Sequence, residues 1–326
     1  MTRWTLILMA AVLLAGLARN DAHAQDGACN GGTTYEKGSA EYTFEHGGLT
    51  RIYRVFVPSG YDGSTPVPLV MTLHGAAGWA AQQEGYSEWN AIAERETFIT
   101  VHPQGALPTG PGFRWNAGEP MRSEGRLFES IFATPDELPD DAAFLTDLLA
   151  RVQTELCIDP ARIYVNGLSN GGGMTHHMAC VLADQIAAVG TVAGAYTAIP
   201  GGCVPARSIP VITFHGKRDN IVAYEGSDQI NLEPVGAWAA AWAERNGCDE
   251  TPETVEGTTG AVTGIRYVNC DDDAEIVFYT IADAGHTWPG AEPLIPFILG
   301  AASQDIDASE TMWAFFAAHP LEISTP

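Results

Sequence analysis

A serine between glycines is the part of this sequence best suited to covalent chemistry. The segment Gly167-Leu168-Ser169-Asn170-Gly171 follows the apolar run 163–165 and leads into a helix-like stretch. A serine hydroxyl is a poor nucleophile at neutral pH, so enzymes hold it on a sharp strand-to-helix turn beside a base and backbone N–H donors. Because so short a pattern also arises by chance in a glycine-rich chain, Ser169 is a candidate nucleophile only if its partners are present.

Two later residues have the types and positions expected of those partners. In hydrolases with such a serine turn, the chain order is serine, acid, histidine. Asp219 follows the apolar run 211–214, and His286 follows the apolar run 276–281. Strands that end at one edge of a sheet would bring both residues to the serine, so we expect Ser169, Asp219 and His286 to form a catalytic triad.

Other acidic and basic residues fit these roles less well. Asp283 could replace the predicted acid, but it lies three residues before the predicted base and is expected in the same turn. His319 follows a helix-like segment and has no strand to direct it. His176 and His177 are adjacent on the helix after the serine turn, so they point in different directions and do not predict a metal pair.

Acyl transfer also needs N–H donors for the tetrahedral oxyanion. One is expected to be the backbone N–H of Asn170, the residue after the nucleophile. The other is expected in the turn His74-Gly75-Ala76-Ala77 after the run 69–73, where we favour the N–H of Ala76. The alternative is that this turn simply ends a strand.

The spacing of apolar residues predicts the elements that position these groups. Helical patterns cover 145–156, preceded by Asp140 and Asp141 as capping and first-turn acids, and 236–246, whose Trp238 and Trp242 we expect in the core. Short apolar runs predict strands buried on both faces. These runs are Ile52–Val57, Leu69–Leu73, Phe98–Val101, Ile163–Val165, Ala188–Val192, Val211–Phe214 and Ile276–Ile281. The alternation predicts an α/β fold, a mostly parallel, doubly wound sheet flanked by helices, with its site at the carboxyl ends of the strands.

Residues 1–24 have the features of a secretory signal peptide. Arg3 precedes an apolar stretch to Leu17, and Ala22-His23-Ala24 is a small-residue cleavage site. An uncleaved membrane anchor is the alternative, but the stretch is short for a bilayer and ends in polar residues. Residues 25–326 are then expected to form a single catalytic domain that is secreted, in the periplasm or outside the cell, with no membrane anchor after cleavage.

The six cysteines all follow the cleavage site and predict disulfides in an exported chain. They are Cys29, Cys157, Cys180, Cys203, Cys248 and Cys270. Zinc is the competing interpretation, but no C-x-x-C pair or clustered Cys/His spacing supports it, so no metal is expected. The one pairing we predict is Cys248 with Cys270, which would close the excursion between them.

The chain is strongly acidic, with a net charge of -24. Nucleic acid and anionic membrane surfaces are poor partners for such a field. Only two lysines are present, Lys37 and Lys217. An acidic, lysine-poor surface is compatible with a saline habitat, and ordinary solubility explains it equally well.

Taken together, the motifs resemble a group of secreted esterases among the α/β-hydrolases that includes polyhydroxybutyrate depolymerases and feruloyl or acetylxylan esterases. The resemblance rests on Gly48–Arg54, Pro68–Val70, Leu73–Gly75, Pro103–Gly105, Trp115–Gly118, the serine turn, His215-Gly216 with Asp219, and Gly285–Gly290. It implies the triad Ser169, Asp219 and His286 and an oxyanion hole of Ala76 and Asn170. It also implies substrate contacts by Trp288, Trp115 and His74, and no cofactor.

The chain departs from that family in two places. Members often carry a cysteine after the His-Gly dipeptide and a Cys-Cys pair after the Trp-Asn-Ala-Gly stretch, where this chain has Ala76 and Glu119-Pro120-Met121. The segment Arg122–Pro139 follows instead, and we expect it to cover part of the cleft, with a solvated surface insertion as the alternative. For the apolar run Leu294–Leu299 we expect buried loop packing.

These observations predict a secreted serine carboxylic-ester hydrolase that acts through an acyl-enzyme on polyester or plant cell-wall esters. A serine peptidase on the same fold is one alternative, although nothing resembles the propeller or cap domains of such enzymes. An inactive hydrolase fold used for binding is another, although such a protein has no need to keep every catalytic group. Feruloyl esters, acetylated xylan and hydroxyalkanoate polyesters all remain open as substrates.

Overall fold

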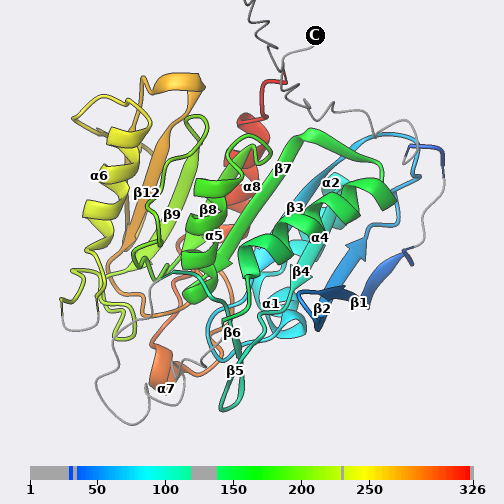
Figure 1. The fold of residues 1–326 in the computed structure, drawn as a ribbon. Coiled ribbons are helices and arrows are strands. Elements are labelled where there is room, and N and C mark those ends of the chain that lie inside the picture. The colour runs from blue at the N-terminus through cyan, green and yellow to red at the C-terminus, as the bar shows by residue number, and fades with distance from the viewer. Residues whose placement is uncertain (1–28, 32–34, 119–137, 229–230, 324–326) are drawn as a thin grey trace, which may run out of the picture.

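The computed structural model describes residues 29–31, 35–118, 138–228 and 231–323 (Figure 1). Two expectations fall outside this part of the chain: the signal peptide at residues 1–24, and all but the last two residues of the segment Arg122–Pro139. In the described residues, no helix combines the length and the apolar character that a membrane crossing requires.

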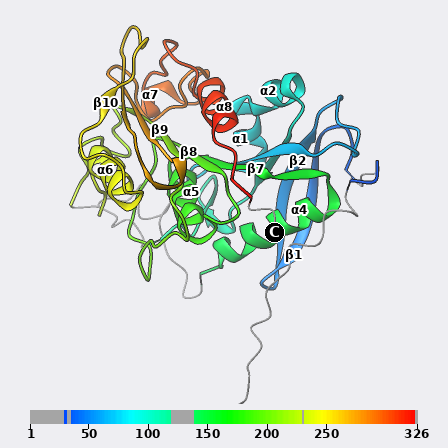
Figure 2. The same cartoon turned by 90° about the horizontal axis from the view of Figure 1, so that it is seen from above.

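A ten-stranded sheet forms the centre of the molecule, with its middle strands parallel and its edges antiparallel (Figures 1 and 2). The predicted mostly parallel, doubly wound α/β sheet is therefore confirmed. In spatial order the strands are β1 (Gly38–His46), β2 (Leu49–Val57), β4 (Ile99–Pro103), β3 (Val67–Leu73), β7 (Ile158–Leu168), β8 (Ala188–Val192), β9 (Val211–Gly216), β12 (Ile276–Ile281), β11 (Val262–Tyr267) and β10 (Glu253–Thr254). The neighbouring strands β4, β3, β7, β8, β9 and β12 run parallel to one another, so their carboxyl ends lie at the same edge of the sheet.

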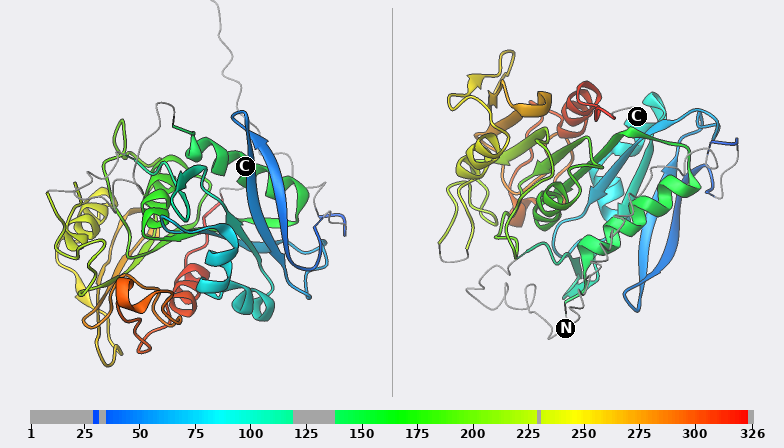
Figure 3. Two further views of the ribbon diagram at one scale, coloured as in Figure 1. Left: turned by 90° about the horizontal axis from the view of Figure 1, so that it is seen from below. Right: turned by 45° about the horizontal axis from the view of Figure 1, so that its top comes forward.

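Helices cover both faces of this sheet (Figures 1 and 3). One face carries α4 (Asp141–Glu155), α5 (Asn170–Val181) and α6 (Val235–Arg245), and the other carries α1 (Ala80–Ser87), α2 (Trp89–Glu96) and α8 (Ala308–Ala318). Successive side chains of β3 point to opposite faces of the sheet. Leu69 and Met71 pack in the core under α4, α5 and α6, and Val70 packs in the core on the opposite face. Trp238 and Trp242 are buried in the core, as predicted.

The helix predicted at 145–156 begins four residues earlier, at Asp141. Asp140 caps it as expected, because its side chain accepts a hydrogen bond from Ala143 N–H at 2.9 Å. The edge strands β1 and β10, and β11 beside β10, were not predicted. In β1, half-buried residues alternate with exposed ones, and a search for continuous apolar runs detects only strands that are buried on both faces.

The apolar run Leu294–Leu299 is not buried as predicted. It contains the short helix α7 (Pro296–Leu299), and five of its six residues are exposed: Leu294, Ile295, Pro296, Phe297 and Ile298. Composition alone predicts burial, but a single helical turn at the surface has no second layer to cover it.

Three disulfides join the six cysteines, and the predicted Cys248–Cys270 pair is confirmed. It links the residues after α6 to the short 3-10 helix η1 (Asp271–Asp273) and so closes the excursion that contains β10 and β11. Cys29–Cys157 ties the N-terminal segment to the start of β7, and Cys180–Cys203 ties the end of α5 to the loop after β8. Such links stabilise the fold mainly by restricting the unfolded chain.

His176 lies buried among aromatic rings between α5 and α6. Its Nδ1 accepts a hydrogen bond from Trp242 Nε1 at 3.2 Å, beside the stacked rings of Tyr196 and Trp238, whose centroids are 3.6 Å apart. Burial, together with the positive charge of Arg245, lowers the pKa of His176 to about 3. The imidazole is therefore neutral in the folded protein.

We expect this histidine to make the fold sensitive to acid. The unfolded chain binds the proton with a pKa near 6.5 and the folded ring with a pKa near 3, so the free energy of unfolding decreases as the pH falls from 6.5. Between pH 7 and pH 5 one such residue accounts for a loss of about 2 kcal/mol. In urea unfolding, His176→Gln should lose about 2 kcal/mol less than the parent protein over this interval. Equal losses would rule out this role for His176.

Candidate active site

Ser169 lies at the turn between β7 and α5, in a backbone conformation that serine seldom adopts. Its φ of 56° and ψ of -119° place it in a strained region, as nucleophile turns require. Its N–H donates to Val192 O at 2.9 Å, and its carbonyl accepts from Gly173 N and Ala195 N. These three backbone hydrogen bonds hold the strained residue in place.

The turn that contains Ala76 lies directly beside Ser169. The first turn of α5 passes so close to the end of β3 that a Cβ at Gly171 would lie 2.3 Å from Leu73 O, which only glycine permits. A Cβ built at Gly75 would be 3.3 Å from Ser169 Cβ. The two segments predicted to supply oxyanion donors are therefore neighbours.

His74 holds this turn in place through hydrogen bonds to the backbone. Its Nδ1–H donates to Gly75 O at 2.8 Å, and its Nε2 accepts from Gly105 N–H at 2.9 Å. Burial lowers the pKa of His74 to about 4, which keeps the ring neutral and preserves both bonds. Because the ring is buried and both nitrogens are bonded, its position contradicts the substrate contact predicted for His74.

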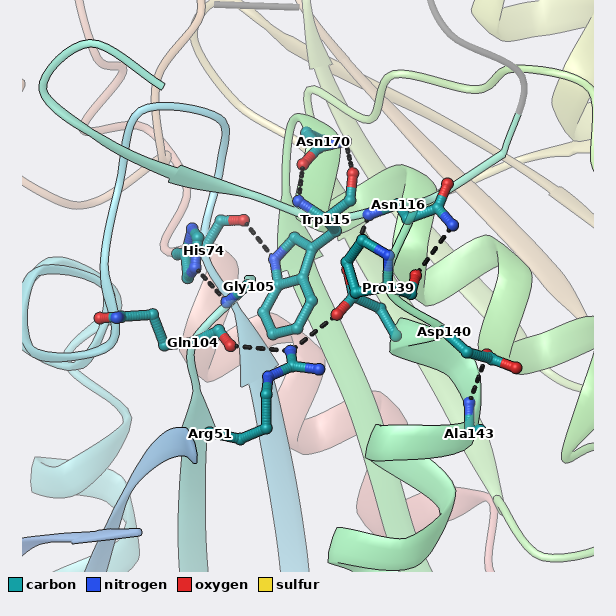
Figure 4. A network of polar contacts seen from close by, with 11 residues as sticks. Arg51, His74, Gln104, Gly105, Trp115, Asn116, Pro139, Asp140, Ala143 and Asn170 are labelled. Carbon is teal, nitrogen blue, oxygen red and sulfur yellow. Dashed lines mark hydrogen bonds and ion pairs between the residues drawn. The ribbon is translucent and has the colours of Figure 1, made fainter. Parts of the chain in front are cut away.

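Trp115 and Trp288 are also buried and leave no ring surface for a ligand, contrary to prediction. Trp115 Nε1 donates to His74 O at 2.9 Å (Figure 4). Trp288 donates from its backbone to Tyr86 Oη at 2.9 Å and from Nε1 to Ser309 Oγ at 3.0 Å. Both tryptophans hold the loops around the site in place. A sequence motif does not show whether a tryptophan has this role or contacts the substrate.

The Asn170 side chain joins these segments, a function that sequence reasoning missed. Its Oδ1 accepts from Trp115 N–H at 2.7 Å, and its Nδ2 donates to Trp115 O at 3.3 Å (Figure 4). From the sequence, only the backbone N–H of Asn170 was expected to take part in the site. The amide thus binds the loop of Trp115 to the first residue of α5.

The predicted acid and base meet at the carboxyl edge of the sheet. His286 Nδ1 lies 2.7 Å from Asp219 Oδ2, and both residues are buried. Asp219 Oδ1 accepts from the N–H groups of Ile221 and Val222 at 2.8 Å each. The alternative acid Asp283 is exposed, and Asp219 is the carboxylate that contacts His286.

A second histidine, His215 at the end of β9, also contacts the acid. Its Nε2 lies 2.9 Å from Val222 O and 3.3 Å from Asp219 Oδ2. Burial alone would raise the pKa of Asp219, but the charges and hydrogen bonds of His286 and His215 outweigh it and lower that pKa below its usual range. The sequence motif contained His215 four residues before the acid, and this spacing was the available signal.

A buried ion pair supports the same region from the side of α4. Arg51 on β2 donates to Gln104 O at 3.1 Å (Figure 4). It also donates to Asp141 Oδ1 at 2.7 Å, and Asp141 Oδ2 accepts from Asn116 N–H at 2.8 Å. The Arg51 guanidinium also lies 3.7 Å from the centre of the Phe144 ring. Asp141 lies in the first turn of α4, as predicted, and also joins three segments beneath the site.

Among the described residues, His176, Cys180 and Cys203 place metal-ligand atoms within 4.8 Å of one another. The two sulfur atoms are bonded to each other in a disulfide, and His176 Nδ1 accepts from Trp242, so these atoms are not available to an ion.

Comparisons with known proteins agree with this geometry. The chain is 33% identical over 240 residues to feruloyl esterase B of Piromyces equi, covering 70% of this chain and 41% of that enzyme. It is 27% identical to poly(3-hydroxyalkanoate) depolymerase C of Paucimonas lemoignei, covering 72% and 57% respectively, so it spans about half the length of these two relatives. No protein-family model matches the chain.

Among solved structures, acetyl xylan esterase from Aspergillus awamori superposes with a TM-score of 0.56 at 16% identity, covering 85% of this chain and 99% of that one. This likeness concerns the fold, which is that of the α/β-hydrolases. The chain thus has the α/β-hydrolase fold and is homologous to feruloyl esterases and poly(3-hydroxyalkanoate) depolymerases.

The Arg51–Asp141 pair yields a prediction about stability. Asp141→Asn leaves the buried guanidinium without its counter-charge and should reduce the free energy of unfolding by about 3–5 kcal/mol. Asp147→Asn on the same helix is the matched control, because Asp147 is largely exposed and forms an ion pair at the surface with His46 at 3.2 Å. Its effect should stay below about 1 kcal/mol. Equal effects in urea unfolding at pH 7 would contradict the buried pair's role.

Proposed function

We propose that this chain is a secreted carboxylic-ester hydrolase in which Ser169, Asp219 and His286 form the catalytic triad. The observation that carries the proposal is the buried Asp219–His286 pair, at 2.7 Å, on the edge of the sheet where β7 ends in the strained Ser169 turn. An ion pair that only stabilised the protein surface would not need to be buried at this edge of the sheet. Acyl transfer, in contrast, needs a base that is oriented and shielded from water.

The proposed reaction has two halves. Ser169 Oγ bonds to the ester carbonyl carbon while His286 takes the hydroxyl proton, and Asp219 holds the imidazole and stabilises its charge. The N–H groups of Ala76 and Asn170 stabilise the oxyanion. The C–O bond to the alcohol then breaks, and the alcohol leaves with the proton from His286. Water, deprotonated by His286, attacks the acyl-enzyme. The bond between Ser169 Oγ and the acyl carbon then breaks, Ser169 takes the proton back from His286, and the acid leaves.

The remaining expectations belong to the same proposal. We propose that residues 1–24 are removed as a signal peptide and that residues 25–326 act as one catalytic domain outside the cytoplasm. Three disulfides support an oxidising compartment for the mature chain. The names of the relatives point to substrates that are esters of ferulic acid or of hydroxyalkanoates. An inactive binding protein would need another use of the Asp219–His286 pair. A serine peptidase would use the same pair, so ester turnover is what distinguishes it from the proposed function.

Replacement of the nucleophile tests the proposal. Ser169→Ala should lower kcat by about 10⁴ to 10⁶ on p-nitrophenyl acetate, p-nitrophenyl butyrate, methyl ferulate or a hydroxybutyrate oligomer, whichever the parent turns over. Ser208→Ala is the control, since Ser208 is also buried but contacts Asn246 rather than the catalytic loops. Near-normal activity of Ser169→Ala would reject the triad. Absence of any ester turnover by the parent would favour the peptidase or binding alternatives.

His215 gives a second catalytic prediction. His215→Leu removes a hydrogen bond to a charged acceptor, which is worth about 1.5–3 kcal/mol, so kcat should fall roughly 10- to 100-fold. KM should stay within about twofold, because His215 contacts the acid and not the substrate. His215→Gln keeps an N–H donor and should recover part of kcat. Equal kcat values for the two variants, or a loss confined to KM, would refute this positioning role.

A further inference from the structure

His74 is buried beside the turn at residues 75–78, and the proposed reaction assigns it no part. Gly78 N–H donates to Gly75 O at 3.1 Å and closes this turn. Ala77, in the third position, has a φ of 64°, the positive value that a type II turn requires there. In such a turn the N–H of the second residue takes no part in the closing bond, so it is free to bind a ligand.

Ala76 occupies that second position. Among the described residues, no acceptor contacts its N–H, and Ala76 is only half-buried. The turn lies against the proposed nucleophile, because a Cβ at Gly75 would be 3.3 Å from Ser169 Cβ. An oxyanion formed on Ser169 is stabilised only by donors that point at it, so the direction of the Ala76 N–H decides its catalytic value.

The direction of this N–H is set by the carbonyl of the preceding residue. Gly75 C=O and Ala76 N–H belong to one planar peptide group, which is trans, so the two bonds point in opposite directions. His74 Nδ1–H donates to Gly75 O at 2.8 Å from the buried side of the turn. This hydrogen bond therefore points the Ala76 N–H away from the buried ring.

The backbone around His74 selects a single tautomer of its ring. Gly105 N–H donates to Nε2 at 2.9 Å, so Nε2 carries no proton and Nδ1–H is the donor to Gly75 (Figure 4). The Gly105 loop packs tightly, because a Cβ there would lie 2.5 Å from Arg114 O. Trp115 Nε1 donates to His74 O at 2.9 Å, and the two ring centroids are 5.0 Å apart. The imidazole is thus held with its proton on Gly75 O.

We propose that His74 is a positioning residue that aims the Ala76 N–H at the oxyanion through its hydrogen bond to Gly75 O. This inference rests on the proposed ester-hydrolase function and adds a residue that acts through the backbone of the turn. The donor matters most when negative charge develops on the carbonyl oxygen, so His74 affects the transition state and not the binding of the ester. Gly78 N–H still holds Gly75 O when His74 is replaced, so this loss costs less than loss of the donor itself.

Two amide variants separate the two hydrogen bonds of the ring. In His74→Asn the amide lies at the place of Nδ1 and can donate to Gly75 O. In His74→Gln it lies at the place of Nε2 and can bond only to Gly105. His102→Gln is the control, because His102 is similarly buried but contacts Thr100 Oγ1 on its own strand. Each variant is assayed on p-nitrophenyl acetate, and urea unfolding gives its folded fraction.

His74→Gln should lower kcat roughly 10- to 100-fold, a smaller loss than the removal of an oxyanion donor causes. KM should stay within about twofold, and kcat of His74→Asn should be at least about three times that of His74→Gln. His102→Gln should match the parent.

An aliphatic trifluoromethyl ketone provides an independent readout of the oxyanion site. Ser169 Oγ bonds to the ketone carbon, His286 takes the hydroxyl proton, and the ketone oxygen becomes the anion between the donors. The inhibition constant should therefore rise by the same factor as kcat/KM falls.

Equal kcat values for the two amides, a loss confined to KM, or a fall in kcat with an unchanged inhibition constant would overturn the proposal. One measurement needs no variant that folds. In the parent labelled with ¹⁵N-histidine, long-range ¹H–¹⁵N spectra should show His74 protonated at Nδ1 alone, and a proton on Nε2 would also overturn the proposal. Failure of the proposed function is distinguishable, because the parent would then show no Ser169-dependent turnover of p-nitrophenyl acetate.

Discussion

The close approach of α5 to the end of β3 is the constraint on which the site depends. A Cβ at Gly171 would lie 2.3 Å from Leu73 O, so the helix can begin there only because this residue has no side chain. The approach places Ser169 beside the turn of Ala76 and leaves the serine at a φ of 56°. Such strain costs on the order of 1–3 kcal/mol, and it persists because three backbone hydrogen bonds and the packed helix hold it.

Around this contact, buried polar groups connect the loops to one another. The Asp219 carboxylate accepts hydrogen bonds from two backbone N–H groups and contacts two histidines, and this keeps it charged despite its burial. Asn170, His74 and Asp141 each bond to the backbone of a segment that is distant in sequence. Buried polar groups are stable only when they are bonded, so each link also fixes the geometry of the loop it reaches.

Much of this arrangement was predictable from the sequence because it depends on local patterns. Apolar runs identify strands that are buried on both faces. The loop after such a strand begins at the edge of the sheet, and Asp219 and His286 were chosen because they lie in such loops. The edge strand β1 was missed because its half-buried pattern is weak. The burial of Trp115 and Trp288 was missed because it depends on contacts with distant residues such as His74 and Ser309. The exposure of Phe297 likewise depends on how α7 packs against distant parts of the chain, which composition does not show.

An acyl-enzyme on Ser169 is the central claim of this account, and trapping it is the most direct test. The protein is mixed with p-nitrophenyl butyrate and quenched in acid within milliseconds, and its peptides are analysed by mass spectrometry. We expect a burst of p-nitrophenol approaching one equivalent per active site if deacylation is slower than acylation, and a butyryl group on the peptide that contains Ser169. Ester turnover with the butyryl group on another residue, or with Ser169 unmodified under conditions that show a burst, would contradict it.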